Sequence, residues 1–342
     1  MIENVTELSE YISLTAEEAD AILKVGERYP WRVTGYYASL MDREDRSCPL
    51  RRQAVPDAAE LDSSYGDPDP LSEEINSPVP GVVRVYPDRI AVIVTGRCPV
   101  YCRHCLRKRL AGEKSADLDD DDLDRILSYI KRDRTIRDVL LTGGDPLMLD
   151  DGRFDSILGS IRAVGHVEIL RIGTRVPCTW PERVTASFAD MVASHKPVWV
   201  STQFNHPKEI TPESERAVAA LVEKGVPVNN QSVLLRGVND SIGVMTELVR
   251  KLVKIRVRPY YLYQAQTLTG TGHFVTSIEK GLEIIKGLRG WTTGFAVPQY
   301  VLDTPFGKIP MNPEYFRGRS GNYVEMENFQ GKLWREFNPL QK

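Results

Sequence analysis

The sequence lacks the features that direct a protein into a membrane or onto a nucleic acid. None of its apolar runs reaches the roughly 18 residues that a membrane-spanning helix needs. The first residues, MIENVTELSEYISL, are acidic and contain no basic stretch followed by an apolar one, which excludes a secretory signal. Lysine and arginine total 44 against 47 aspartates and glutamates, so no basic excess attracts nucleic acid or an anionic membrane. These absences favour a small-molecule partner and predict a cytoplasmic location.

Cysteine is also scarce, and it is unevenly placed. The chain has five cysteines: Cys48, Cys98, Cys102, Cys105 and Cys178. An odd number with three members crowded together makes a poor disulfide framework. In a cytosolic chain such a crowded group more often binds metal or carries out redox chemistry.

A regular alternation of strand and helix patterns begins near residue 90. Apolar, β-branched runs typical of strands occur at 90–95, 138–144, 167–174, 197–204, 226–234 and 258–264. Amphipathic stretches typical of helices lie between them, for example at 123–132, 154–164, 214–225 and 244–254. Six successive βα units predict an α/β fold with a parallel sheet, either a barrel or doubly wound. In both architectures the active site lies at the carboxyl ends of the strands.

The pattern divides the chain into three segments. Residues 1–83 are expected to form a helical and wrapping region, residues 84–294 the repeated βα units, and residues 295–342 a C-terminal segment. Within the first segment, the stretch from Pro49 to Pro80 is rich in proline, aspartate and serine. Such a stretch fits either a linker or an arm over the active site, and the sequence does not decide between them.

The motif CPVYCRHC is the strongest chemical signal in the chain. It spaces Cys98, Cys102 and Cys105 as C-x3-C-x2-C directly after the first predicted strand. A [4Fe–4S] cube normally takes four thiolates, so three leave one iron open for another ligand. In radical chemistry that ligand is S-adenosylmethionine, which yields a 5′-deoxyadenosyl radical on reduction. The alternative is a zinc site completed by His104, Cys48 or Cys178, but zinc sites usually pair two CxxC-type motifs, and no second pair exists.

A second motif, LTGGDP, ends the next predicted strand. Glycine tolerates positive φ and lets the backbone approach a ligand closely. Following the cysteine motif by one βα unit, Gly143, Gly144 and Asp145 are therefore expected to lie against the amino group of S-adenosylmethionine.

Taken together, the motifs resemble the lysine 2,3-aminomutase family of radical S-adenosylmethionine enzymes. The resemblance runs from about residue 30 to about residue 315, through SPVPG, YPDR, CPVYCRHCLRKR, LTGGDPL, RIGTRVP, QFNHP, NQSVLLRGVND, YYLYQ, HFVTSIEKGLEII, GFAVPQYVLD and GKIP. It implies a partial (β/α)6 barrel, pyridoxal 5′-phosphate as a further cofactor, and migration of an α-amino group to the β-carbon. L-lysine is the leading substrate. The same shift on arginine, ornithine or glutamate, or a radical enzyme without pyridoxal phosphate, remains the alternative.

The resemblance also implies roles for individual residues. Lys308, in FGKIP, matches the lysine that binds pyridoxal phosphate, and Arg89, in YPDR, matches an arginine that holds its phosphate. Tyr263 is placed beside the pyridoxal ring. Arg107 matches the arginine that clamps the substrate carboxylate, a task that suits a planar guanidinium. Gln231 matches a contact to S-adenosylmethionine.

The chain departs from the family pattern at several of these positions. Asp303 matches one of two aspartates that bind the distal ammonium of lysine, but Gln266 stands where the other is expected. Val85 replaces a second phosphate-binding arginine, for which neighbouring Arg84 is a candidate substitute. Gln203 replaces a histidine expected near S-adenosylmethionine. The loop between Asp303 and Lys308 is shorter and less glycine-rich than the family pattern.

The resemblance extends to partners and metals. It implies a small amino acid as substrate, an electron donor such as flavodoxin or ferredoxin, and the possibility of a homo-oligomer. Family members with a longer tail carry a zinc-binding cysteine cluster there. No cysteine follows Cys178 in this sequence, so we expect no structural zinc.

Overall fold

A curled sheet forms the centre of the molecule. The computed structural model describes residues 1–112 and 117–337, and within these residues nine strands form one sheet in simple chain order. Its strands are β1 (Val82–Val83), β2 (Arg89–Thr95), β3 (Asp138–Gly143), β4 (Ile169–Gly173), β5 (Val198–Thr202), β6 (Val228–Leu234), β7 (Arg258–Gln264), β8 (Gln299–Thr304) and β9 (Gly307–Met311). Strands β2 to β8 are parallel, whereas β1 and β9 run antiparallel at the two edges. All six predicted strands are present.

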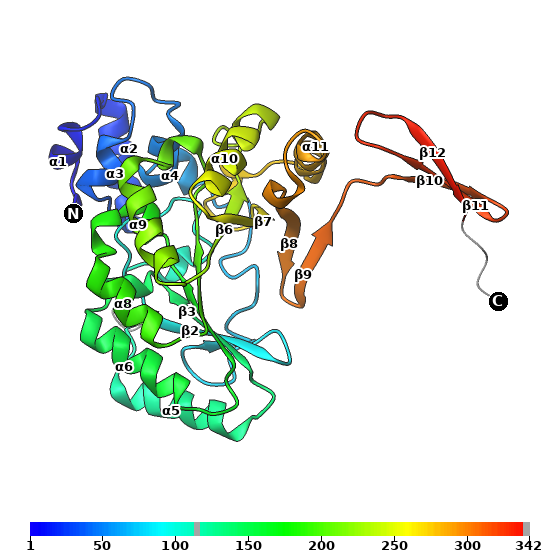
Figure 1. Cartoon of the computed structure of the whole chain (residues 1–342). Helices are drawn as coiled ribbons and strands as arrows, with labels where there is room; N and C mark the ends of the chain where they lie inside the picture. The colour runs from blue at the N-terminus through cyan, green and yellow to red at the C-terminus, as the bar shows by residue number, and fades with distance from the viewer. Residues whose placement is uncertain (113–116, 338–342) are drawn as a thin grey trace.

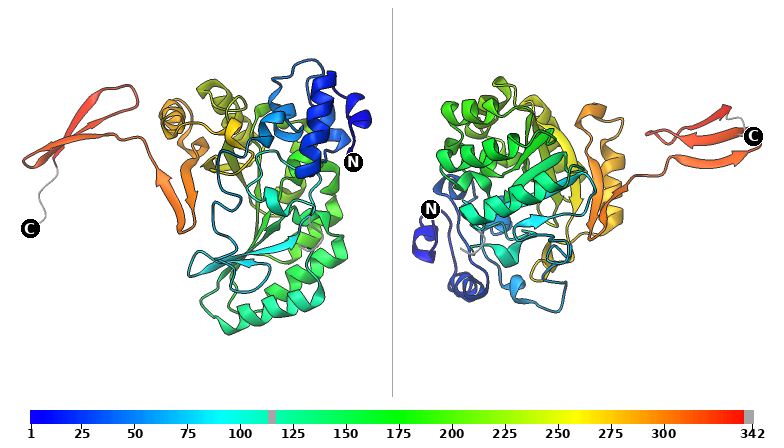
Figure 2. Two further views of the ribbon diagram at one scale, coloured as in Figure 1. Left: turned by 180° about the vertical axis from the view of Figure 1, so that it is seen from behind. Right: turned by 90° about the horizontal axis from the view of Figure 1, so that it is seen from below.

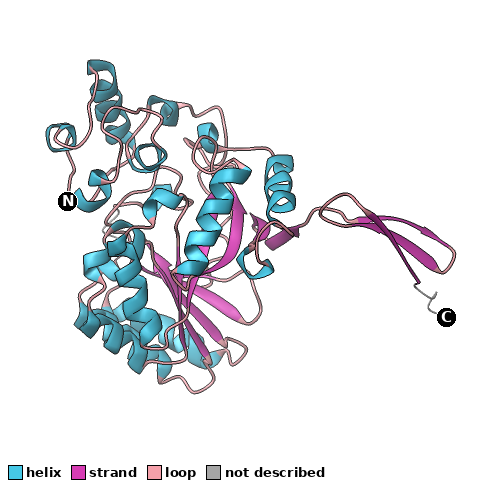
Figure 3. Ribbon diagram, turned by 45° about the horizontal axis from the view of Figure 1, so that its top comes forward, coloured by secondary structure: helices cyan, strands magenta, loops and turns pink. Residues whose placement is uncertain are grey.

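Helices cover the convex face of this sheet (Figure 1, Figure 3). The helices that follow the strands are α5 (Asp120–Arg132), α6 (Asp151–Arg162), α7 (Val176–Thr179), α8 (Ala186–Ser194), α9 (Pro212–Glu223), α10 (Ile242–Lys254) and α11 (Ile278–Leu288). Of these, α7 is a single turn whose last residue lines the cavity on the concave side instead. Six of the seven begin at a capping side chain, for example Asp119 before α5 and Ser241 before α10, which satisfies a free N–H of the first turn. Because the strand order never reverses, the helices lie on one side and the sheet curls around the other. The predicted partial barrel is confirmed, and the doubly wound alternative is excluded.

Alternation along the strands separates the core from the site. In β3, Val139 and Leu141 are fully buried under the helices. Asp138, Leu140 and Thr142 point to the concave side, where they line a cavity. Successive residues of a strand face opposite sides of the sheet, so in β3 the odd-numbered Val139 and Leu141 face the helices and the even-numbered residues face the cavity. The barrel therefore places its polar residues inside the curl.

The N-terminal segment packs over one end of the curled sheet. Its helices are α1 (Val5–Ser9), α2 (Ala16–Arg28), α3 (Gly35–Ser39) and α4 (Pro49–Ala54). Residues 62–80, which we call the strap, then cross the mouth of the barrel. Asp67 pairs with Leu268 beyond β7, and Glu73 lines the cavity. The proline-rich stretch is therefore an arm over the site rather than a linker.

A separate small sheet ends the described chain. It consists of β10 (Phe316–Ser320), β11 (Tyr323–Glu327) and β12 (Leu333–Phe337), and it projects away from the barrel (Figure 2). Strands β8 and β9 belong to the main sheet. The predicted boundary at residue 294 therefore separates these two strands from the other strands of the same sheet. Residues 338–342 of the predicted third segment lie outside the described residues, and the division into segments stays a prediction.

Short 3-10 helices complete the connections. They are η1 (Ala58–Leu61), η2 (Lys108–Leu110), η4 (Pro146–Met148), η5 (Pro181–Arg183), η6 (Pro207–Glu209), η7 (Gly272–Phe274) and η8 (Gly294–Ala296). Within the described part of the chain, the helices are too short or too polar to span a bilayer.

Candidate active site

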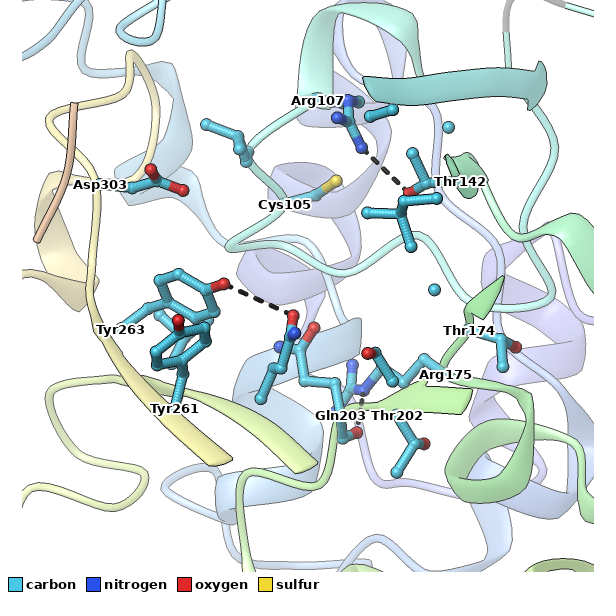
Figure 4. A pocket seen from close by; sticks show the side chains of 18 of the residues that line it. Cys105, Arg107, Thr142, Thr174, Arg175, Thr202, Gln203, Tyr261, Tyr263 and Asp303 are labelled. Atoms are coloured by element: carbon cyan, nitrogen blue, oxygen red, sulfur yellow. Dashed lines mark hydrogen bonds between the residues drawn. The ribbon is translucent and has the colours of Figure 1, made fainter. Parts of the chain in front are cut away.

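One cavity of about 770 Å³ occupies the concave side of the sheet (Figure 4). Its volume lies in the upper part of the range that ligand sites span. Every site residue predicted from the sequence lines it: Arg89, Cys98, Cys102, Cys105, Arg107, Gly143, Gly144, Asp145, Gln203, Gln231, Tyr263, Gln266, Asp303 and Lys308. Strands and loops that are far apart in the sequence thus contribute residues to the same cavity.

The three cysteines lie on the loop that follows β2. Burial raises the pKa of the Cys98 thiol well above its usual value and that of Cys105 to about 11. Thiols in such a site remain protonated unless a metal replaces the proton. Arg175 adds positive charge, since its Nη1 donates to Cys102 Sγ at 2.8 Å. The donor set therefore suits an iron–sulfur cluster bound through three thiolates.

The structure gives little support to the zinc alternative. Neither Cys48 nor Cys178 lines the cavity. His104 lines it, but its Nε2 lies 3.0 Å from the amide of Gln203. Among residues 1–112 and 117–337, no three histidine, cysteine or carboxylate side chains converge on a point where one ion could bind. A cube is held through different iron atoms, so its thiolates need not converge in this way.

The close packing of the backbone requires both glycines of LTGGDP. Gly143 has φ +120°, and a Cβ there would lie 2.6 Å from the carbonyl oxygen of Thr95. A Cβ on Gly144 would lie 2.4 Å from the carbonyl oxygen of Arg97. Both glycines thus let β3 pack against the backbone that leads into the cysteine loop. Their contact with S-adenosylmethionine stays a prediction.

Asp145 is occupied by neighbouring donors. Its carboxylate accepts hydrogen bonds from Thr174 Oγ1 at 2.7 Å, from the Arg175 N–H at 2.8 Å and from the Leu147 N–H at 3.1 Å. Burial raises the pKa of this carboxyl. These bonds join the ends of β3 and β4, so a structural role accounts for the side chain; binding of an amino group by Asp145 remains untested.

Arg107 points into the cavity from the loop after Cys105. Its Nε and Nη2 bind both oxygens of Glu73, at 2.7 to 3.1 Å, and its Nη1 donates to Thr142 Oγ1 at 3.2 Å. The Glu73 side chain, which comes from the strap, is only 6% exposed. The guanidinium is therefore held in one orientation, with the edge that carries Nη1 beside the Thr142 hydroxyl (Figure 4).

Lys308 faces the cavity from the β8–β9 hairpin. Its Nζ lies 3.2 Å from a carboxylate oxygen of Asp303, the residue paired with it across the hairpin. Gln266 is close to the same group, since its Nε2 donates to the Asp303 carbonyl at 3.2 Å. The predicted cofactor lysine and both predicted side-chain ligands of the substrate tail are thus brought together.

Arg89 and Arg84, which lie close together in the sequence, have different surroundings. Arg89 lines the cavity, and its guanidinium lies 3.6 Å from the centre of the Tyr86 ring. Arg84 donates to Tyr129 and Asp133 instead, and it does not line the cavity. In this structure Arg84 therefore does not replace the arginine missing at Val85, because its donors are used on the outside of the barrel.

Tyr263, Gln203 and Gln231 also line the cavity. Burial, followed by the charge of Asp303, raises the pKa of the Tyr263 phenol well above its usual value. Its hydroxyl lies 3.5 Å from Gln231 Oε1. Because the ring is held within the barrel and faces the Lys308 amine at 5.6 Å, it can border a planar cofactor.

Several cavity residues are not predicted by the sequence motifs. Glu73, Tyr86 and Arg175 all contact predicted site residues, yet none was assigned a role. The available signals were the motif RIGTRVP, which contains Arg175, and YPDR, which begins at Tyr86. Glu73 gave no sequence signal, because an acidic residue in a polar loop is ordinarily solvated.

Comparisons with known proteins agree with this geometry. Residues 92–249 match the Radical SAM superfamily, and residues 285–339 match a family described as Lysine-2,3-aminomutase. The L-lysine 2,3-aminomutase of Clostridium subterminale is 46% identical over 342 residues, covering 99% of this chain and 82% of that protein. The chain belongs to the lysine 2,3-aminomutase family.

Other members of the family are similarly close. The L-lysine 2,3-aminomutase of Fusobacterium nucleatum subsp. nucleatum is 45% identical, covering 97% of this chain and 79% of its own length. The glutamate 2,3-aminomutase of Clostridioides difficile is 41% identical with the same two coverages. This member of the family is therefore a radical S-adenosylmethionine enzyme and an isomerase that moves an amino group. A [4Fe–4S] cluster and S-adenosylmethionine are its implied cofactors, as the cysteine spacing predicted.

Proposed function

We propose that this aminomutase converts L-lysine to β-lysine with pyridoxal phosphate bound at Lys308. One observation carries the proposal: the cluster cysteines, Arg107 and the Lys308–Asp303 pair line a single cavity. A radical formed at the cluster would therefore meet an amino acid held by Arg107 beside Lys308. When bound, the cluster with S-adenosylmethionine would supply a hydrogen-abstracting radical, and pyridoxal phosphate would hold the migrating nitrogen in a carbon–nitrogen double bond to which the neighbouring carbon radical can add.

Arg107 is assigned to the substrate carboxylate. Glu73 takes Nε and Nη2 in a bidentate pair and Thr142 accepts from Nη1, which leaves one N–H on each terminal nitrogen for a second carboxylate. A guanidinium fixed on one edge presents the other in a defined direction, and this lowers the entropy lost on binding. The amino acid is thereby held with its β-carbon in a constant position.

Asp303 is assigned to the substrate tail. Its carboxylate pairs with the Lys308 ammonium at 3.2 Å. We assign the same carboxylate to the distal ammonium of lysine, which would carry the same charge as the Lys308 ammonium. Gln266, whose Nε2 is already bonded, offers its carbonyl oxygen as a second acceptor. The side-chain carboxylate of a glutamate substrate would instead be repelled by Asp303, which carries the same charge.

The decisive experiment is a substrate panel. The reconstituted, reduced enzyme is incubated anaerobically with S-adenosylmethionine and, separately, lysine, arginine, ornithine and glutamate. β-Lysine is the expected principal product, and failure of borohydride to attach pyridoxal to Lys308 would remove the cofactor from the proposal. A β-amino product from another amino acid, with none from lysine, would reassign the substrate. Chemical reduction replaces the cellular electron donor, which we propose is a flavodoxin or ferredoxin in the cytoplasm.

A further inference from the structure

The open barrel leaves two sheet edges that face each other across the cavity. One edge carries β1 and the loop into β2, and the other is β9, which pairs only with β8 in the part of the chain that the structure describes. The outward N–H groups of an edge strand have no strand partner. For Lys308 in β9, the partner is the side chain of Tyr86, whose hydroxyl oxygen accepts the Lys308 N–H at 2.8 Å. This bond joins residues 222 positions apart in the chain.

The ring of Tyr86 contacts two further site elements. The Arg89 guanidinium lies 3.6 Å from the ring centre, close enough for a cation–π interaction. Gly307, just before Lys308, has φ +114°, and a Cβ there would lie 3.2 Å from ring atoms of Tyr86. The backbone of the hairpin therefore approaches the ring as closely as a residue without a side chain allows. The Lys308 amine lies 5.8 Å from the same ring centre.

Tyr86 thus touches both proposed anchors of the cofactor. One pyridoxal phosphate must reach the amine with its aldehyde and the arginine with its phosphate, so the two residues must lie within the limited span of a single cofactor. Arg89 begins β2, next to the first edge strand, whereas Lys308 lies in the last strand, and among the described residues no strand pairing links the two edges. Sites on separate elements need a supporting side chain to hold their geometry.

We propose that Tyr86 is the positioning residue that sets the distance between Lys308 and Arg89. The hydroxyl holds the backbone of Lys308, and the ring face holds the guanidinium of Arg89. The inference rests on the proposed binding of pyridoxal phosphate and adds to it a residue that acts through its contacts with Lys308 and Arg89.

The test measures cofactor binding rather than turnover. The full-length protein, with its cluster reconstituted, is titrated with pyridoxal phosphate, and borohydride then fixes bound pyridoxal to lysine for peptide mapping. Tyr86→Phe removes the acceptor of the Lys308 N–H and keeps the ring, so we expect about 5-fold weaker binding, the worth of one hydrogen bond. Tyr86→Leu also removes the contact with Arg89, and about 50-fold weaker binding is expected.

A matched control separates positioning from general damage. Tyr129→Phe removes a hydroxyl that pairs with Arg84 outside the cavity, and it should leave pyridoxal binding unchanged. Iron content and binding of S-adenosylmethionine should match the wild type in all three variants. If the wild type takes up no label on Lys308, the proposed function fails and this inference with it. If the wild type is labelled but both Tyr86 variants bind pyridoxal equally well, or lose iron in parallel, the role of Tyr86 alone is refuted.

Discussion

A buried carboxylate behind the cysteine loop allows a quantitative prediction. Glu60 is fully buried and accepts from Arg103 Nε at 2.9 Å and Nη2 at 2.6 Å, from Lys108 Nζ, and from the Asp57 N–H at 2.9 Å. Arg103 lies between Cys102 and Cys105, and Lys108 follows Cys105 by three positions. Glu60 thus fastens the cluster loop to the N-terminal segment, and Glu60→Gln removes the charge with almost no change in volume.

The expected loss follows from the burial of all three charges. The side chains of Arg103 and Lys108 are 2% and 5% exposed, so neither cation can turn to water when its partner is removed. Removing one partner of a buried pair costs about 3–5 kcal/mol. Glutamine keeps one carbonyl acceptor, which places Glu60→Gln near the lower end, about 3 kcal/mol of the roughly 5–15 kcal/mol typical of a folded domain.

The pH of the measurement matters because Glu60 titrates differently in the folded chain. Burial acts to raise the pKa of this carboxyl, but Arg103 and Lys108 hold it below its ordinary value of 4.5. A lowered pKa means that the folded state binds fewer protons than the unfolded state. The stabilisation is therefore present in full above pH 4.5 and is lost as the pH falls through the folded-state pKa. Unfolding at pH 7 reports the whole contribution.

Denaturant unfolding of anaerobic, reconstituted protein measures the change. Glu74→Gln is the matched control, because Glu74 is 77% exposed and approaches Arg109 only at 3.5 Å. We expect the control to stay within about 0.5 kcal/mol of the wild type. Iron content should fall in Glu60→Gln, since the loop that holds Cys105 is loosened. A loss of stability below about 1 kcal/mol with full iron content would refute the reasoning, because burial would then not control the energy of this network.

Three further substitutions test the cavity. Arg107→Ala should raise KM for the amino acid about 10- to 100-fold, the worth of a charge-assisted pair, with iron per chain unchanged; loss of iron would show that the residue serves the cluster instead. Gln266→Asp adds a second carboxylate beside Asp303 and should raise kcat/KM for lysine about 10-fold in a product assay, whereas a fall would argue against a cationic tail. Gly144→Ala places a Cβ 2.4 Å from the Arg97 carbonyl oxygen and should lower the melting temperature by several degrees; an unchanged melting curve would contradict the close packing.

Much of the fold was predictable because it depends on local patterns. The six strand patterns and the amphipathic stretches between them correspond to β2–β7 and to the helices on the convex face. A period of two for strands and of about 3.6 for helices needs only neighbouring residues. Whether the sheet is doubly wound or curls into a half barrel depends on strand order, which no local period contains. The projecting sheet β10–β12 was not anticipated either, since its exposed strands bury almost no alternating face.

The site residues also divide into those that local motifs predict and those that only the folded structure brings together. The spacing of Cys98, Cys102 and Cys105 on one loop predicts iron–sulfur chemistry. The resemblance to known motifs predicted the positions of Lys308 and Arg107. The partners of these residues come from elsewhere: Glu73 lies 34 positions before Arg107, and Tyr86 lies 222 positions before Lys308. Chemistry carried by residues close in sequence can be read from the chain alone. The orientation and spacing of those groups depend on contacts that exist only once distant segments have packed together.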